Sequence, residues 1–232
     1  MLQITDHIYG IMTKMHFVNY YVIDNDGVLT VIDIGLSSGD VKTLERELES
    51  KGWSLEQVQH ILITHAHPDH IGGLAALQAR SNAHTYIHRR DAAVVRGGEK
   101  SPTEKPENLG FFGRMMLRII ANATMEPARV DTELNGGEVL VDILPGLEVI
   151  HLPGHSYGQC GFWLPDEKLL IGGDVMMNFP WGISKPLRFV SPDWNAVHES
   201  IRKVADLDVQ ILCLGHGAIV RGNVSDKIAH LL

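Results

Sequence analysis

Short runs of β-branched and other apolar residues recur along this chain, separated by turns or by stretches with helical periodicity. Residues 19–23 and 28–34 are two such runs, and the Asp-Gly turn within residues 24–27 is typical of a β-hairpin. Residues 41–52 show an amphipathic helical pattern that ends at a glycine, and residues 58–64 indicate a buried strand. Further helices are expected near 69–80 and at 193–206, and further strands at 147–152, 160–164, 168–173 and 210–215. This alternation predicts an α/β protein in which two packed sheets are covered on the outside by helices.

Size and charge narrow the possible partners. The 232 residues suffice for one core, and we expect a single domain over residues 1–232. The net charge of −8 argues against nucleic acid, because such proteins neutralise phosphates with basic side chains. No apolar run approaches the roughly 20 residues that span a bilayer, and the N-terminus lacks the pattern of a secretory signal. We therefore expect a cytoplasmic protein with no membrane partner and a small-molecule substrate, in which Cys160 and Cys213 are free thiols.

Residues 96–130 differ from the rest of the chain. They begin with a charged, turn-rich stretch and continue into a cluster of phenylalanine, methionine and isoleucine at 111–120. Such a cluster suits a peripheral helix, and it equally suits a lid over a cleft, because methionine-rich surfaces adapt to varied apolar ligands. We predict a helical, lid-like insertion near 96–130, and leave open whether it covers a substrate, packs at the periphery or forms a homodimer contact.

The residues that indicate chemistry lie directly after a buried strand. Four potential metal ligands occupy six positions there, namely His65, His67, Asp69 and His70. Imidazoles and a carboxylate crowded on one turn repel and desolvate one another unless a cation binds them. The cluster therefore predicts a metal site. The step at Pro68 turns the second pair of ligands away from the first, so one segment can serve two adjacent metals.

Three further ligand candidates stand at the ends of apolar strands, each beside glycine that allows close backbone approach: His155, Asp174 and His216. With the first cluster they give five histidines and two carboxylates. This donor set suits divalent metal ions, with zinc as the first choice and iron, manganese and cobalt as alternatives.

Coordination chemistry divides these donors between two metals. Two ions roughly 3.5–4 Å apart can share a hydroxide, because binding lowers the pKa of water from about 15.7 toward 7. We expect this hydroxide to attack an ester, lactone, thioester or phosphoester, with Asp69 as the catalytic residue that orients it and then protonates the leaving group. The division that fits best is His65, His67 and His155 on one metal, Asp69, His70 and His216 on the other, and Asp174 bridging.

The motif has a known counterpart. The segment from His65 to His70 resembles the HxHxDH motif of the metallo-β-lactamase-fold hydrolase superfamily, and the three later candidates follow in that family's order. The resemblance covers nearly the whole chain, including the hairpin that ends near Gly35. It implies a four-layer αββα sandwich with the site at one edge. It also implies that Asp33 supports the metal ligands, although a turn-forming role at a strand end would explain Asp33 equally well.

Two residues indicate which branches of this family the chain does not resemble. True metallo-β-lactamases lack a bridging aspartate at the position of Asp174, which argues against antibiotic hydrolysis. Flavodiiron proteins replace the second histidine of the motif with glutamate, and this chain has His67. Persulfide dioxygenase-like members, which use one iron, remain an alternative from oxidoreductase chemistry.

Among hydrolases, the chain is similar both to acyl-homoserine lactonases and to glyoxalase II-type thioesterases. The lactonases often place a tyrosine three residues after the bridging aspartate, where this chain has Met177. Another tyrosine would have to substitute, and the candidates are Tyr20, Tyr21 and Tyr157. Glyoxalase II binds glutathione through basic residues in a C-terminal helical region, and this chain offers only Lys203, Arg221 and Lys227 there.

The side chains expected around the substrate are largely apolar. Residues 175–182 continue directly from the bridging aspartate and are well placed to line a cleft. The substrate-binding candidates are His16, Phe17, Met177, Phe179 and Trp181. Such walls favour a lactone or carboxyl ester with an acyl chain over a charged glutathione conjugate. Phosphotriesterase activity could accompany it, because the same metal pair stabilises a phosphoryl centre.

Overall fold

The computed structural model describes residues 1–13, 17–97, 99–120 and 125–232. Its larger sheet has seven strands in the order β1-β2-β3-β4-β5-β6-β7. Neighbouring strands are antiparallel from β1 to β4 and parallel from β4 to β7. The strands are β1 (Leu2–Gln3), β2 (Ile8–Met12), β3 (Asn19–Asn25), β4 (Val28–Ile32), β5 (Val58–Leu62), β6 (His84–His88) and β7 (Thr132–Leu134).

The second sheet has five strands in the order β14-β13-β10-β9-β8. Only the β10–β13 pair in it is parallel, so both large sheets are mixed. A separate hairpin of β11 (Met177–Phe179) and β12 (Gly182–Ser184) follows β10. The strands of the second sheet are β8 (Glu148–His151), β9 (Cys160–Leu164), β10 (Leu169–Gly173), β13 (Ile211–Leu214) and β14 (Val220–Arg221).

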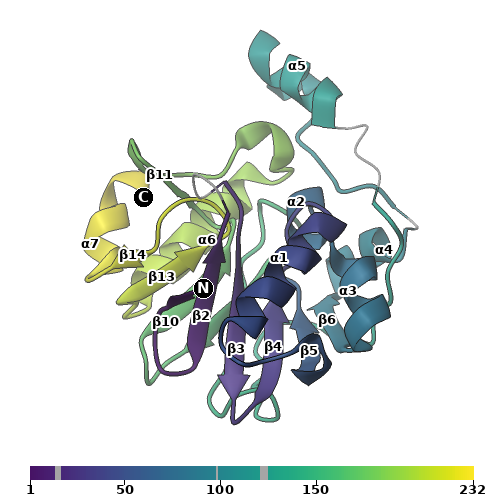
Figure 1. Ribbon diagram of the computed structural model, residues 1–232. Coiled ribbons are helices and arrows are strands. Elements are labelled where there is room, and N and C mark those ends of the chain that lie inside the picture. The colour runs from purple at the N-terminus through teal and green to yellow at the C-terminus, as the bar shows by residue number, and fades with distance from the viewer. Residues whose placement is uncertain (14–16, 98, 121–124) are drawn as a thin grey trace.

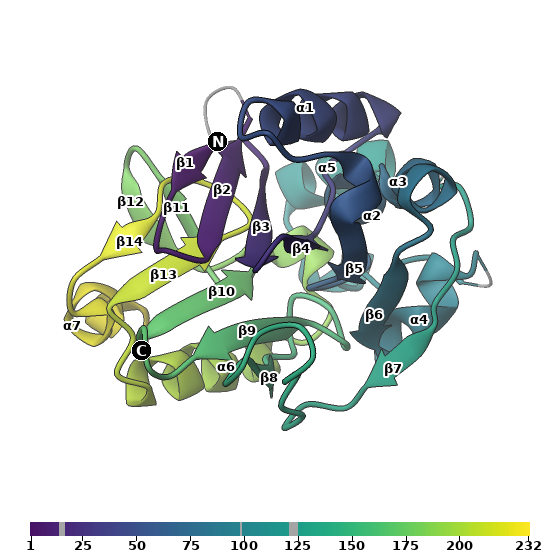
Figure 2. The ribbon, with the colours of Figure 1, turned by 60° about the horizontal axis from the view of Figure 1, so that its bottom comes forward.

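Helices cover the outer face of each sheet (Figures 1 and 2). Those associated with the first sheet are α1 (Ser38–Glu49), α2 (Pro68–Ile71), α3 (Leu74–Ser81) and α4 (Arg89–Val95), and those on the second are α6 (Trp194–Asp206) and α7 (Val224–Ile228). Short 3-10 turns are η2 (Leu55–Gln57), η3 (Pro106–Asn108), η4 (Arg188–Val190) and η5 (Ala229–Leu231). Within the described residues, no helix is long and apolar enough to cross a membrane.

The alternation of side chains along the strands produces three layers of core. On β3, Tyr20 and Val22 pack toward the helices, whereas Tyr21 and Ile23 pack toward the second sheet. A third apolar cluster lies between the second sheet and the helices α6 and α7. The predicted αββα sandwich is therefore confirmed.

Local sequence signals explain most element boundaries. In the predicted hairpin, Asp24 Oδ1 accepts a hydrogen bond from the amide of Gly27 at 2.8 Å, and β3 and β4 pair directly across this turn. The helix expected at 41–52 begins earlier, at residue 38. Its N-cap is Ser37, and Asp40 completes a capping box that periodicity alone does not reveal.

The helix expected near 69–80 is instead two helices, α2 and α3, separated at Gly72 and Gly73. Packing explains the glycine at this point, because a Cβ atom at Gly72 would lie 1.9 Å from the backbone oxygen of Leu36. The chain therefore passes very close to its own backbone at this point, which only glycine permits.

In the described part of the insertion at 96–130, residues 96–97, 99–120 and 125–130, the α-helix is α5 (Phe111–Ile120), which projects from the body of the molecule (Figure 1). Its Leu117 packs with Leu109 against two apolar residues of η4. Phe111 and Phe112 are 87% and 65% exposed. The helix therefore packs against η4 and leaves apolar side chains exposed to solvent.

Candidate metal centre

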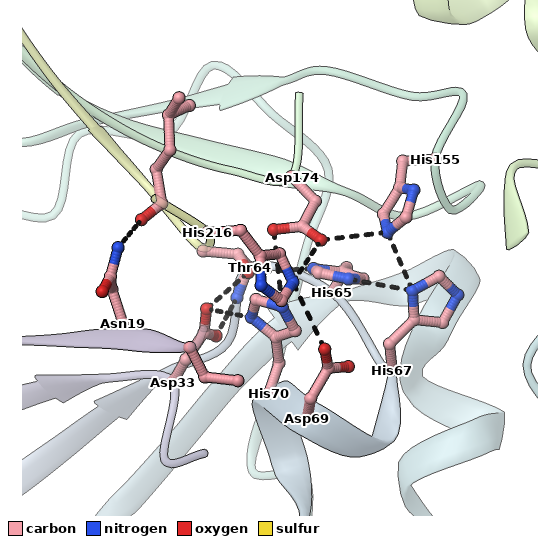
Figure 3. A network of polar contacts seen from close by, with 12 residues as sticks. Asn19, Asp33, Thr64, His65, His67, Asp69, His70, His155, Asp174 and His216 are labelled. Atoms are coloured by element: carbon pink, nitrogen blue, oxygen red, sulfur yellow. Dashed lines mark hydrogen bonds and ion pairs between the residues drawn. The ribbon is translucent and has the colours of Figure 1, made fainter. Parts of the chain in front are cut away.

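The seven predicted ligands converge at one edge of the two sheets (Figure 3). Four lie in the segment that runs from the end of β5 into α2, where His67 is the N-cap residue of the helix. The other three follow the ends of β8, β10 and β13. All seven carry donor atoms in compact groups that could hold a metal ion: His65, His67 and His155; His65, His70 and Asp174; and Asp69, His70 and His216.

The first group consists of three imidazoles. Nδ1 of His67 lies 3.0 Å from Nε2 of His65 and 2.9 Å from Nε2 of His155. Burial lowers the pKa of His65 well below its usual value, and burial together with nearby His155 lowers the pKa of His67 to about 3. Both rings are therefore neutral at ordinary pH, which is the form that binds a metal.

Hydrogen bonds on the outer side of the His65 and His155 rings fix the tautomers of these two residues. Thr64 Oγ1 donates to Asp33 Oδ2 at 2.7 Å, so it accepts from Nδ1 of His65, which lies 3.1 Å away. Ser191 Oγ donates to a backbone carbonyl at 2.8 Å, so it accepts from Nδ1 of His155 at 3.0 Å. Nε2 of each ring therefore has a free lone pair directed at the centre of the group.

The group of Asp69, His70 and His216, called the second group from here on, combines imidazoles with a carboxylate. Nε2 of His216 lies 3.3 Å from Asp69 Oδ2 and 3.1 Å from Asp174 Oδ2. The same Asp174 oxygen lies 3.3 Å from Nε2 of His155 in the first group. Asp174 thus lies between the two groups, where a bridging ligand would be.

Two of the buried polar atoms that lack hydrogen-bond partners face each other, which indicates that a cation belongs between them. Nε2 of His70 and Oδ1 of Asp174 face each other across 3.5 Å, and neither makes a hydrogen bond. Unpartnered polar atoms are rare in protein interiors and call for an explanation such as an ion. Imidazole nitrogen and carboxylate oxygen are ligands that divalent metals of the zinc type prefer, so the residues present fit such ions.

Protons stabilise this second group when no cation is bound. Burial alone would lower the pKa of His216, but Asp174 and Asp69 raise it to about 10. Burial would likewise lower the pKa of His70, but Asp174 and Asp33 raise it well above its usual range. Burial opposes ionisation of Asp174, yet His216 and His70 hold its pKa well below the ordinary value. A binding cation would therefore displace protons from these rings.

Asp33, the residue that the resemblance placed beside the ligands, contacts Thr64 and His70. Its Oδ1 accepts from the amide of Thr64 at 2.8 Å, and its Oδ2 lies 2.8 Å from Nδ1 of His70. The residue is 2% exposed and has a left-handed backbone with φ of 58°. Its carboxylate thereby directs Nε2 of His70 toward the site.

A cavity of about 730 Å³ opens beside the ligands. Its described walls come from Phe17 after β2, from α4, from residues 97 and 99–103, from β11 and from residues 187, 189 and 190. The lining residues are Phe17, His67, Pro68, Asp69, Val94, Gly97, Glu99, Lys100, Ser101, Pro102, Thr103, Met125, His155, Asp174, Met177, Phe179, Leu187, Phe189, Val190 and His216. The wall at residues 97 and 99–103 lies in the segment predicted as a lid-like insertion, whereas the wall at residues 187, 189 and 190 was missed from sequence, because nothing in that segment marks it as close to the ligands.

The predicted substrate-binding residues have different positions. Phe17, Met177 and Phe179 line the cavity. Trp181 is not among the lining residues, is 79% exposed, and stacks on Phe179 with ring centroids 5.0 Å apart. It therefore contacts the cavity wall from outside. His16 lies outside the described residues.

The tyrosines considered as substitutes lie elsewhere. Tyr20 and Tyr21 are buried in the core, Tyr157 is 40% exposed, and the described lining contains none of them. Met177 does line the cavity, at the position where lactonases often have tyrosine. Polarisation of a substrate carbonyl would therefore depend on other groups of the site.

Residues that support the loop of His216 were also missed. The side-chain amide of Asn19 donates to the backbone oxygens of Leu214 at 3.0 Å and Gly217 at 2.7 Å. Tyr21 Oη donates to the same Leu214 oxygen at 2.6 Å. The only sequence signal was a polar residue at the start of an apolar strand, which does not identify a partner almost 200 residues away.

Comparison with known proteins agrees with this architecture. A model of the metallo-β-lactamase superfamily matches residues 14–216. The probable metallo-hydrolase YflN of Bacillus subtilis is 25% identical over 83% of this chain and 76% of its own length. A hydroxyacylglutathione hydrolase of Cereibacter sphaeroides is 27% identical over 85% of this chain, which spans 62% of that relative. The metallo-β-lactamase family protein TTHA1429 of Thermus thermophilus has a TM-score of 0.75 at 21% identity, with 99% of this chain and 79% of that chain covered.

Fold and site together define an αββα protein with a divalent-metal site. The chain belongs to the metallo-β-lactamase superfamily, which confirms the resemblance, and it is a metal-dependent hydrolase.

Proposed function

We propose that the protein uses two divalent cations, with zinc as the physiological metal, to hydrolyse a lactone or carboxyl ester that carries an apolar acyl group. The observation behind this proposal is the apolar cavity of about 730 Å³ directly beside the ligands. Its volume lies within the roughly 300–1,000 Å³ range of small-molecule sites. Phosphotriesterase activity is a secondary proposal, because such cations also stabilise a phosphoryl centre.

The charges of the cavity favour an apolar substrate over a glutathione conjugate. Glutathione carries two carboxylates, and a site for it needs basic partners. Among the lining residues that the structure describes, Lys100 is the one lysine or arginine, and Glu99 lies beside it in the sequence. Leu187, Phe189 and Val190 present apolar surface instead, which suits an acyl chain.

The protein's own residues have distinct tasks in this reaction. Bound cations supply Lewis acidity, which activates water and stabilises the negative charge that develops on the carbonyl oxygen. Asp69 lines the cavity close to His216. Burial would raise the pKa of Asp69, but the hydrogen bond from His216 and the charge of His70 hold it below its usual value. Asp69 is therefore ionised, and its carboxylate can accept a hydrogen bond that orients the attacking water. In this proposal it has the further task of passing the water's proton to the leaving oxygen.

Metal content tests the proposal first. We expect about two cations per wild-type chain and fewer in His67→Ala and Asp174→Ala. The control is His7→Ala, because His7 is exposed and belongs neither to the ligand groups nor to the described cavity lining. One iron per chain, unaffected by replacement of Asp69 or His70, would refute the dinuclear hydrolase and favour persulfide oxidation.

A series of lactones with lengthening acyl chains tests the substrate. Burial of each methylene contributes about 0.8 kcal/mol, so kcat/KM should rise up to about fourfold per methylene until the cavity is filled. A glutathione thioester serves as the comparison, because relatives named hydroxyacylglutathione hydrolases make thioester hydrolysis the second candidate. A higher kcat/KM on that thioester, with no dependence on acyl length, would replace the lactone proposal.

A further inference from the structure

A buried carboxylate outside the ligand set contacts the loops of the first histidine group. Asp91, in the first turn of α4, is 1% exposed. Its Oδ2 accepts from Ser156 Oγ at 2.7 Å and from the amide of Ala66 at 3.1 Å, and its Oδ1 accepts from the amide of Gly158 at 2.8 Å. Burial raises the pKa of Asp91, and these three donors act against that rise. The three donors thus lie in two loops, one that contains Ala66 and one that contains Ser156 and Gly158.

Those loops carry all the ligands of the first group. Ala66 lies between His65 and His67, and Ser156 directly follows His155. A hydrogen bond to the Ala66 amide fixes the peptide plane between two ligands, and so fixes the directions in which their side chains leave the backbone. The Ser156 contact places the His155 loop against the same carboxylate.

The helix that carries Asp91 gives it a firm position. Ala92, Val94 and Val95 of α4 are buried in the core between the helices and the first sheet. The carboxylate therefore sits on a packed element and contacts two loops that have no regular structure of their own. Among side chains, a carboxylate is well suited to accept three hydrogen bonds in this way.

We propose that Asp91 is a positioning residue that sets the spacing of His65, His67 and His155, and thereby the affinity of the first cation. The inference rests on the cation assignment of the proposed function. It extends that assignment to a residue that touches neither cation nor substrate.

Gly158 gives an independent way to disturb the same contact. A Cβ atom there would lie 2.6 Å from Asp91 Oδ1, closer than real Cβ atoms approach. Gly158→Ala would therefore displace the carboxylate without removing its charge. Gly110→Ala is the matched control, because a Cβ atom at Gly110 has nothing within 4 Å.

Chelator competition on Asp91→Asn tests the proposal. The asparagine side chain has the size of aspartate, but its NH₂ group would face at least one of the three N–H and O–H donors, so that hydrogen bond would be lost. Loss of such a supporting contact typically weakens metal binding about 10–100-fold, and we expect this loss for one cation of the two. Gly158→Ala should act in the same direction, Ser156→Ala more weakly, and Gly110→Ala not at all.

Amide hydrogen exchange in the metal-free protein gives a readout that does not depend on activity. Exchange at Ala66 and Gly158 should accelerate in Asp91→Asn and in no control. Asp24→Ala, which removes a carboxylate from the β3–β4 turn, reports the effect of an ordinary loss of stability.

The outcomes separate this proposal from the proposed function. A wild-type protein that binds no cation would refute the function itself. A wild type that binds two cations, with one lost in His67→Ala, supports the function. In that case, unchanged affinities in Asp91→Asn and Gly158→Ala would overturn the role of Asp91 alone. If Asp91→Asn fails to fold, Gly158→Ala and Ser156→Ala decide by the same measurement.

Discussion

Replacing Asp33 with asparagine removes one negative charge behind His70 and changes little else. Asparagine has nearly the same size, and it tolerates the left-handed backbone that Asp33 adopts at φ of 58°. The alanine variant would add backbone strain to the loss of the carboxylate. Asp33→Asn therefore isolates the hydrogen bonds and charge of this side chain.

The cost follows from the contacts of the two carboxylate oxygens. Oδ2 serves both Thr64 Oγ1 and His70 Nδ1, so the amide oxygen would take its place. The new NH₂ group would then face the Thr64 amide, which now donates to Oδ1 at 2.8 Å. Leaving that buried N–H without an acceptor lowers the free energy of unfolding by about 1–3 kcal/mol. For a chain of this size each kcal/mol corresponds to roughly 2–4 °C in Tm.

Metal affinity should fall as well, because His70 loses the charged partner that orients it. We expect the second cation to bind about 10–100-fold more weakly, which corresponds to about 1.4–2.7 kcal/mol. Chelator competition measures the affinity, and thermal unfolding of the metal-free protein measures the stability. If Tm falls while both affinities stay at the wild-type values, Asp33 serves only to hold Thr64, and the reasoning about His70 is wrong.

Three further predictions follow from the same geometry. Because the pKa of His216 is raised to about 10, this ring keeps a proton in the folded metal-free protein that the unfolded chain loses above about pH 6.5. Its contribution to stability should decline as pH rises from 6.5 toward 10, and cation affinity should increase by up to about tenfold per pH unit over that window in chelator titrations. Gly215→Ala should reduce bound metal in elemental analysis, because its Cβ atom would lie 2.2 Å from Asp174 Oδ1. Phe179→Ala should lower kcat/KM about tenfold for long acyl chains, by the loss of apolar contact, and leave short-chain substrates nearly unaffected.

The convergence of the seven candidate ligands could be predicted from sequence because each of them follows an apolar strand. Strand ends that share a sheet edge bring loop residues together, so neighbours in space are implied by a pattern that is local in sequence. The glycine beside His216 was part of that pattern, and the structure gives its reason, since Gly215 leaves room for Asp174. The sandwich architecture was predictable for a similar cause, since strand alternation already separates Tyr20 from Tyr21.

The remaining features depend on contacts between distant segments. The break between α2 and α3 arises where Gly72 meets the backbone of Leu36, and the helical pattern at 69–80 carries no trace of that contact. Asp91 lies in an unremarkable helix start, and its partners Ala66 and Ser156 are 25 and 65 residues away. Hydrogen bonds of this kind are set by tertiary packing, which a single sequence does not encode in any local pattern.

The two supporting carboxylates contact the site from different elements, and this makes their effects separable. Asp91 reaches only the loops of the first histidine group, whereas Asp33 contacts His70 directly. The path between them runs through Thr64, which binds Asp33 and lies 3.1 Å from Nδ1 of His65. If the energetic coupling through Thr64 is weak, the losses of cation-binding free energy in Asp33→Asn and Asp91→Asn should therefore add within about 0.5 kcal/mol in the double variant. A larger coupling that Thr64→Val abolishes would instead assign Asp33 to both cations through the threonine hydroxyl, because that variant keeps the hydrogen bond from the Thr64 backbone amide to Asp33.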